Sequence, residues 1–214
     1  MRDALPPEAS QTAGLSDMGL HLPNARVRRV LLGIQDVMGA SGLATIVRQA
    51  GQTQYSTSLP PDNQQTELSA ADYAALIQAI ENYYGRGARG TLTRIGASAF
   101  KELVKSRPWL RLIRAAGYRF LPRRQQQRWV LGWLARDMGG RVTVEAYQRR
   151  LRLIDHTSAA TLGRQRETEI CWLTQGEIME ALQWATGHEH VVTETACKAK
   201  GDPVCQFEIG EPLG

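Results

Sequence analysis

Cysteine is scarce in this chain of 214 residues, and its scarcity restricts the class of protein. Three cysteines are too few for the disulfide scaffold of a small secreted domain, and an odd number leaves one thiol unpaired. We therefore expect a reducing, cytoplasmic setting. The first residues lack the apolar core of a signal peptide, and no apolar run approaches the roughly 18 residues of a membrane span. No membrane-spanning segment is expected.

Catalytic signatures are also missing. The sequence has no nucleophile elbow, no H-E-x-x-H motif and no dinucleotide-binding fingerprint. The glycine-rich run G-R-G-A-R-G at 85–90 resembles a phosphate loop only superficially, because no strand pattern precedes it and no G-K-[ST] ends it. A binding role is therefore favoured over an enzymatic one, although the sequence does not decide between them.

Acidic residues are absent from one long basic stretch. The formal net charge is +5, and seven arginines with no acid lie between Arg107 and Arg128. Such a stretch is typical of a surface that contacts nucleic acid, an anionic lipid or an acidic partner protein. A solvated helix face gives the same pattern, so these alternatives stay open.

The chain divides into three parts by composition. Residues 1–23 are polar and lack periodicity, which predicts a disordered tail. Residues 24–140 carry helical patterns, and residues 141–210 carry strand patterns around one further helix. Because 43% of the residues are hydrophobic, the two structured parts are expected to share the core of a single domain.

Start and stop signals predict where the helices lie. Asn24 and Ser69 are expected to cap helices, and Gly39 interrupts the first of them. Pro108 ends or kinks a long helix near Ser106, since proline does not continue a helix.

Period-two alternation begins after the helical part. Two short strands are predicted at Val142–Glu145 and Leu151–Ile154, followed by a polar loop. A helix then opens at Cys171 and ends at Gly187, and a hairpin closes the chain. The expected fold is α+β, with N-terminal helices packed on an antiparallel sheet of strand–strand–helix–strand–strand order.

The closing hairpin and the preceding helix hold all three cysteines. Cys197 and Cys205 are centred on Gly201 in the turn K-G-D-P, so they are expected on adjacent strands. Together with Cys171 and Glu194 they form a candidate zinc site, because zinc takes four-coordinate sites of thiolates and carboxylates. Glu194 and Cys197 face opposite ways in a regular strand, so the site requires a bulge near Thr195–Ala196.

Other interpretations of the cysteines remain. Cys197 and Cys205 are placed for a cross-strand disulfide, and all three cysteines are compatible with buried free thiols. A histidine is an alternative fourth ligand, and the candidates are His156, His188 and His190. If Glu194 is the fourth ligand, the metal has no open position and its role is structural.

At the C-terminus the motif V-T-E-T-A-C-K-A-K-G-D-P-V-C-Q-F-E-I follows C-W-L-T-Q-G-E and A-L-Q-W. These motifs resemble the 4-vinyl reductase domain family, also called hydrocarbon-binding domains. The N-terminal R-V-R-R-V-L-L-G-I-Q-D-V-M-G-A-S-G-L and the loop L-P-P-D-N-Q-Q resemble its stand-alone bacterial members, so the resemblance covers roughly residues 24 to 210.

The resemblance implies a fold similar to that of TRAPP transport-particle subunits. It implies structural zinc held by Cys171, Glu194, Cys197 and Cys205. It also implies a small hydrophobic ligand between helices and sheet, and a homodimer formed through the N-terminal helices. Relatives often carry extra cysteines after the second strand, where this chain has T-S-A-A-T-L-G-R, so no second metal is expected.

We therefore expect a sensor or carrier that binds an aromatic hydrocarbon or a tetrapyrrole and passes any output to a partner protein. Apolar faces suggest four residues for the ligand pocket: Phe100, Trp133, Leu153 and Val192. Two alternatives remain. One is an enzyme or accessory subunit of tetrapyrrole vinyl reduction. The other, which is less expected, is a nucleic-acid-binding regulator that uses the basic stretch.

Overall fold

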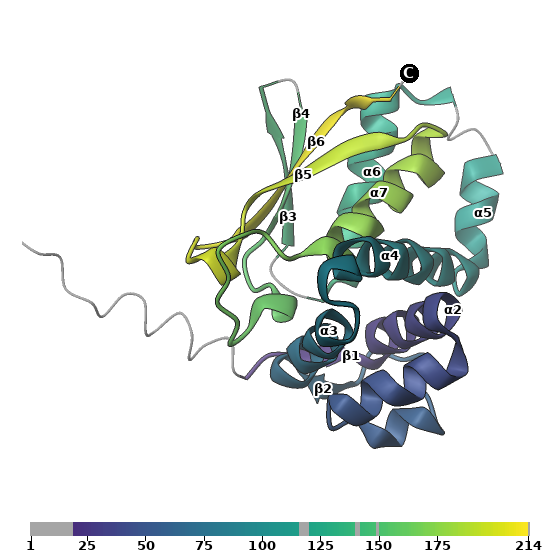
Figure 1. Ribbon diagram of the computed structural model, residues 1–214. Helices are drawn as coiled ribbons and strands as arrows, with labels where there is room; N and C mark the ends of the chain where they lie inside the picture. Colours follow the sequence, from purple (N-terminus) through teal and green to yellow (C-terminus); the bar gives the residue numbers. More distant parts are fainter. Residues whose placement is uncertain (1–18, 116–119, 140–141, 149, 214) are drawn as a thin grey trace, which may run out of the picture.

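The computed structural model describes residues 19–115, 120–139, 142–148 and 150–213 (Figure 1). Helices come first along the chain, and a larger antiparallel sheet with one further helix follows them. The predicted α+β class is confirmed. Of the predicted tail, residues 1–18 lie outside the described part of the chain.

Six α-helices are described, some of them separated by short 3-10 turns. They are α2 (Asn24–Gln49), α3 (Ala70–Tyr84), α4 (Ala88–Lys105), α5 (Pro108–Ala115), α6 (Arg123–Asp137) and α7 (Trp172–Thr186). The strands are β1 (His21–Pro23), β2 (Thr66–Ser69), β3 (Val142–Tyr147), β4 (Arg150–Asp155), β5 (His190–Ala196) and β6 (Cys205–Pro212). Strands β1 and β2 form a small antiparallel pair, and the other four form one antiparallel sheet in the order β3-β4-β6-β5.

The helix signals in the sequence were mostly informative. Ser69 caps α3: its hydroxyl oxygen accepts from the Asp72 backbone N–H at 3.1 Å and donates to the Asp72 carboxylate at 2.7 Å. Pro108 separates α4 from α5, as its fixed φ and missing N–H predict. The cap predicted at Asn24 is wrong. That side chain donates to Oδ1 of Asn63 at 3.1 Å, and α2 begins directly after Pro23.

Helix α2 is long and apolar enough to cross a membrane by length and composition alone. It is interrupted at Gly39, where φ is 74° and ψ is 172°, a conformation that favours glycine. Before this break Val30, Leu31 and Ile34 are fully buried against other helices. Those contacts make α2 a core helix of this fold.

The hydrophobic interior consists of two adjoining clusters. The N-terminal cluster lies among α2, α3 and the first half of α4, and includes Ile34, Ile80 and Ile95. The C-terminal cluster lies between the sheet and the helices α4, α6 and α7, and includes Phe100 and Phe207. Figure 1 shows α6 and α7 beside the sheet, with α4 crossing the lower end of α7. Helix α4 therefore joins the two clusters.

Helices α4 and α7 approach each other so closely that only glycine fits at the contact. A Cβ added to Gly96 would lie 2.0 Å from the carbonyl oxygen of Leu173, and one added to Gly176 would lie 2.0 Å from that of Thr93. Each helix thus presents a glycine to the backbone of the other. This reciprocal contact fixes the position of the first turn of α7, which Cys171 directly precedes.

We predict that Gly96→Ala destabilises the protein by about 2–4 kcal/mol, because the added methyl group forces two backbones apart. Urea unfolding measures the change. Gly90→Ala in the same helix is the matched control, since a Cβ there meets nothing within 4 Å. The control is expected to be neutral or stabilising by up to about 1 kcal/mol. Equal effects of the two substitutions would contradict the close contact.

Candidate metal centre

The three cysteines and Glu194 converge in the folded chain. Cys171 directly precedes α7, Glu194 lies in β5, Cys197 follows β5, and Cys205 begins β6. Their ligand atoms all lie within 4.8 Å of one another, and all four residues are buried. The cluster could hold a metal ion. It is formed by elements up to 34 residues apart, so only the folded chain assembles it.

All three thiols are free. The Sγ atom of Cys171 lies 3.5 Å from that of Cys205 and 3.9 Å from that of Cys197. These distances are far longer than the roughly 2.05 Å of an S–S bond. The structure therefore has the three thiols converging side by side and unbonded to one another.

Strand β5 contains the irregularity that the candidate site requires. Glu194 is opposite Phe207 and Ala196 is opposite Gln206, so the pairing of β5 with β6 shifts at Thr195. Such a bulge inserts one extra residue and turns the following side chains to the other face. The predicted bulge is confirmed, and it brings Glu194 and Cys197 to the same side.

The carboxylate of Glu194 is held by one oxygen only. Its Oε2 accepts a hydrogen bond from the backbone N–H of Cys171 at 2.9 Å. Its Oε1 is buried and has no hydrogen-bond partner. Buried carboxylate oxygens are normally paired, because desolvation of an unpaired polar atom costs free energy. The unpaired oxygen beside three thiols is what a metal ligand would be before the metal binds.

Backbone and side-chain groups of the hairpin turn stabilise the cluster from outside. The carboxylate of Asp202 accepts from the Cys197 backbone N–H at 2.8 Å, and the Lys198 backbone N–H donates to Sγ of Cys205 at 3.3 Å. The hydroxyl of Ser158 lies 3.7 Å from Sγ of Cys171. These supporting residues were not predicted. The turn motif K-G-D-P contains Asp202 and was the only available signal.

Crowding of the four groups changes their proton affinities. Hydrogen bonds from the other two thiols lower the pKa of Cys197 far below its usual range, whereas its hydrogen bond to Cys197 raises the pKa of Cys171. The hydrogen bond from Cys171 lowers the pKa of Cys205, but contact with Cys197 and burial outweigh it and raise that pKa to about 12. Burial raises the pKa of Glu194 to about 8. The cluster therefore holds mostly protons and one thiolate at neutral pH, and a cation could replace the protons.

The three histidines considered as alternative ligands lie elsewhere. His156 is within 3.4 Å of the Thr143 hydroxyl, and His188 is within 3.2 Å of the Arg123 guanidinium. His190 is buried beside Thr186, at 3.2 Å from its hydroxyl. Each histidine thus contacts groups outside the cluster, which consists of three thiols and one carboxylate.

The four predicted pocket residues share one location. Phe100, Trp133, Leu153 and Val192 all belong to or pack against the C-terminal cluster. Phe100 contacts Trp133 edge to face, with 6.2 Å between ring centroids. Their role in ligand binding stays a prediction, because the structure shows them packed against one another.

Three further tryptophans extend this contact, and their spacing in the sequence does not connect them to it. Trp129 stacks on Trp133 with centroids 6.4 Å apart, and Trp109 meets Trp133 edge to face at 6.1 Å. Trp184 contacts Phe100 at 6.3 Å. We call Phe100, Trp109, Trp129, Trp133 and Trp184 the aromatic cluster. It runs from the buried Phe100 to Trp109, whose side chain is 43% exposed.

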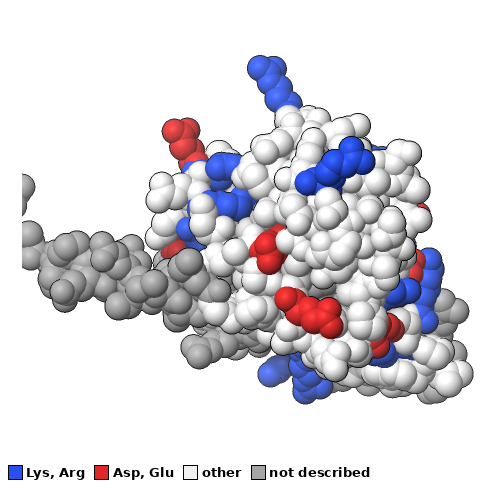
Figure 2. All heavy atoms as spheres, turned by 90° about the horizontal axis from the view of Figure 1, so that it is seen from below, with Lys and Arg blue, Asp and Glu red and all other residues white. Residues whose placement is uncertain are grey.

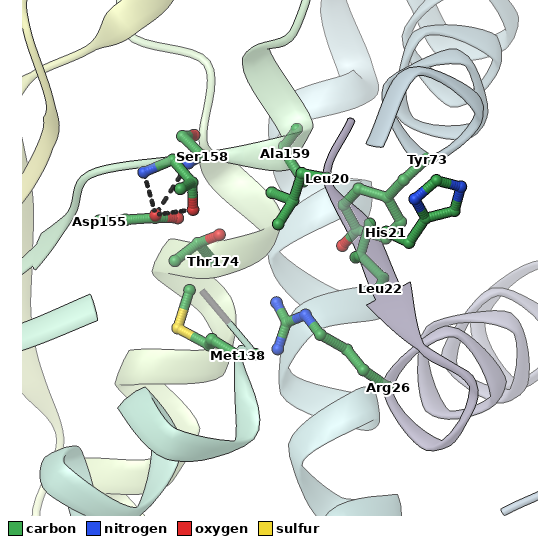
Figure 3. A pocket seen from close by; sticks show the side chains of 13 residues that line it. Leu20, His21, Leu22, Arg26, Tyr73, Met138, Asp155, Ser158, Ala159 and Thr174 are labelled. Atoms are coloured by element: carbon green, nitrogen blue, oxygen red, sulfur yellow. Dashed lines mark hydrogen bonds between the residues drawn. The ribbon is translucent and has the colours of Figure 1, made fainter. Parts of the chain in front are cut away.

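A separate small cavity lies between the two hydrophobic clusters. Figure 3 shows Asp155, Ser158 and Thr174 across from Arg26 and Tyr73. Its volume is about 20 Å³, which suffices for a single water molecule and excludes an aromatic ligand. Asp155 on its lining accepts from the Ser158 backbone N–H at 2.8 Å.

Comparison with known proteins supports the resemblance expected from the sequence. Residues 155–211 match the model of the 4-vinyl reductase domain, and this stretch contains all four members of the cysteine and glutamate cluster. The predicted resemblance is thus confirmed over these residues. Among curated proteins, none matches the sequence of this chain.

The fold is similar to that of H-NOX domains. An H-NOX protein from a study of haem distortion superposes with a TM-score of 0.58 at 11% identity, over 90% of this chain and 97% of its own. An H-NOX protein from S. oneidensis in the Fe(II)NO state gives 0.53 at 10% identity, over 87% and 99%. An oxygen-binding H-NOX domain related to soluble guanylate cyclases gives 0.53 at 11% identity, over 87% and 94%.

We predict that deleting Thr195 abolishes metal binding at the cluster. Without the extra residue, β5 alternates regularly and Glu194 turns away from the thiols. Titration with Co²⁺, followed by its visible absorption, is expected to show binding weakened by about 100-fold or more. Thr195→Ala keeps the bulge and loses only an exposed hydrogen bond to Gln206, so it serves as the matched control. Unchanged Co²⁺ affinity after the deletion would rule out Glu194 as a ligand.

Proposed function

We propose that this chain is a sensor or carrier module that binds a small hydrophobic molecule and contains a structural zinc ion. The observation that carries the zinc proposal is the buried set of three thiols and one unpaired carboxylate oxygen. Cys171, Glu194, Cys197 and Cys205 would hold the ion. With four protein ligands, zinc has no open position for substrate or water.

The donor set and its spacing favour zinc over other cations. Thiolates suit borderline-soft ions, whereas magnesium and calcium prefer oxygen ligands. Zinc bonds to sulfur at about 2.3 Å, so a tetrahedral site separates two sulfurs by about 3.8 Å. The Sγ atom of Cys171 lies 3.5 Å and 3.9 Å from the other two, close to that separation. When bound, zinc would supply charge that stabilises the thiolates and a crosslink between α7 and the hairpin.

Two observations support the ligand-binding proposal. The 4-vinyl reductase domain match and the H-NOX-like fold both fit a small-ligand-binding module. The aromatic cluster supplies the place, because its rings continue from the protein interior at Phe100 to the surface at Trp109. Leu153 and Val192 line the sheet side of the same hydrophobic cluster.

The chemistry of this place fits a planar, apolar ligand. Aromatic rings favour offset-stacked or edge-to-face neighbours, so a flat aromatic hydrocarbon or a tetrapyrrole can replace ring–ring contacts with similar ones. Trp133 already contacts rings on three sides, which makes it the residue most affected by such a ligand. The ligand would enter beside Trp109 and displace side chains that now contact one another.

We further propose a homodimer formed through the N-terminal helices, in a reducing compartment such as the cytoplasm. Figure 2 shows the lower face of the molecule, where acidic and basic groups are scattered over a largely uncharged surface. A face of this kind lacks the like-charge repulsion that would oppose a symmetric contact. Free thiols are the stable form of cysteine in reducing compartments.

Metal analysis tests the zinc proposal. The purified protein is expected to carry about one zinc ion per chain, and Cys171→Ser is expected to lose it and to melt at a much lower temperature. The physical reason is linkage: structural zinc contributes on the order of 10 kcal/mol to the folding of the elements it joins. His156→Ala is the matched control and should retain zinc. Less than about half an equivalent of zinc, together with a Cys197–Cys205 disulfide, would refute the proposal.

Quenching of tryptophan fluorescence tests the ligand proposal separately. Naphthalene and a metal-free porphyrin are the probes, and saturable quenching is expected with at least one of them. Trp133→Phe should weaken this binding by about tenfold, because it removes the ring at the centre of the cluster. Trp172→Phe, outside the aromatic cluster, is the control. Absence of saturable quenching in a zinc-loaded protein would sink the ligand proposal and leave the zinc proposal intact.

A further inference from the structure

Helix α5 and the chain that follows it expose an unusual amount of apolar surface. Nine large hydrophobic side chains are exposed among the described residues, and five of them fall between positions 109 and 121. Their exposed fractions are 43% for Trp109, 69% for Leu112, 38% for Ile113, 91% for Phe120 and 41% for Leu121. We call these five residues the α5 surface. A concentration of this kind marks an interaction site, because exposed apolar residues usually occur singly.

The same part of the chain concentrates positive charge. Residues 103–136 contain nine of the 26 basic residues and none of the 21 acidic ones, so the rest of the chain has 17 basic and 21 acidic residues. Arg123, Arg124 and Arg128 are exposed at the start of α6, directly after the α5 surface. The side chains of Arg111, Arg114 and Arg119 lie outside the described part.

Neighbouring acids do not neutralise this charge. Glu102, at the end of α4, is paired with Lys105 at 2.5 Å, and Glu180 of α7 lies 3.5 Å from Lys101. Both carboxylates are therefore already matched by lysines of α4. The arginines that follow the α5 surface keep their field for an external partner.

We infer that the α5 surface docks on an anionic lipid membrane. An amphipathic helix that combines Trp, Leu and Ile with a basic surrounding binds in the plane of the membrane interface. Its apolar side chains enter the boundary between headgroups and acyl chains, and each nearby arginine adds attraction to anionic lipid. This inference does not depend on zinc or on the small ligand.

Other occupants fit the surface less well. A symmetric contact with a second copy would bring the same arginines against each other, which costs free energy. Nucleic acid would use the arginines but would leave Leu112 and Phe120 exposed to water, since phosphate contacts provide most of that affinity. A lipid surface satisfies the charge and the apolar side chains together.

Sedimentation with vesicles tests the inference with the full chain. Vesicles of phosphatidylcholine with about 30% phosphatidylserine are expected to bind about tenfold more tightly than phosphatidylcholine alone. Raising the salt from about 0.1 M to about 0.5 M should weaken this binding, because the charged groups are exposed. Quenching of tryptophan emission by brominated acyl chains should decrease in Trp109→Phe, which places that side chain in the interface.

Paired variants separate the apolar and the charged contributions. The double substitution Leu112→Ser and Phe120→Ser should weaken vesicle binding by about tenfold, and Arg123→Gln with Arg124→Gln should do the same and reduce the salt dependence. Tyr83→Ser with Leu213→Ser is the matched control, because both side chains are exposed by more than half outside the α5 surface. An equal loss in this control would overturn the inference.

Two other results would also overturn it. If the protein binds unrelated duplex DNA more tightly than the anionic vesicles, and this needs the arginines but not Leu112 and Phe120, the surface binds nucleic acid. If it forms a dimer that Leu112→Ser with Phe120→Ser dissociates, and anionic vesicles do not bind, the surface covers a second copy.

Discussion

The close crossing of α4 and α7 is the contact on which the rest of this structure depends. Gly96 and Gly176 let each helix touch the backbone of the other, so the two helices lie closer than any side chain would allow. Helix α4 carries residues of both hydrophobic clusters, and α7 begins directly after Cys171. A single helix contact thus joins the two halves of the interior and positions one corner of the candidate metal centre.

The candidate metal centre is where the sheet meets this helix pair. The bulge in β5 directs Glu194 toward the thiols, and the backbone N–H of Cys171 holds one of its oxygens in place. Three buried thiols beside a buried carboxylate repel each other's charge, so the groups keep most of their protons until a cation replaces them. Burial therefore makes the site both dependent on a metal and suited to hold structure.

The aromatic cluster and the α5 surface occupy the other end of α4. Trp109 belongs to both: one edge meets Trp133, and 43% of its side chain is exposed. A hydrophobic ligand that reaches the interior beside Trp109 would pass the apolar side chains proposed to contact a membrane. The same amphipathic helix would then serve docking and access, because both need exposed apolar groups next to the core.

Local patterns in the sequence were sufficient for the α+β class, for the cap at Ser69, for the break at Pro108 and for the membership of the cysteine and glutamate cluster. Each depends on spacing along a few residues or on a compact motif, including the bulge that the positions of Glu194 and Cys197 demand. Tertiary structure decided the rest. The sequence could not reveal that Gly96 and Gly176 touch backbones, since that depends on the distance between two helices far apart in the chain. Nor could it distinguish a buried α5 from an exposed one, because burial is a property of what packs against a helix and not of its own pattern.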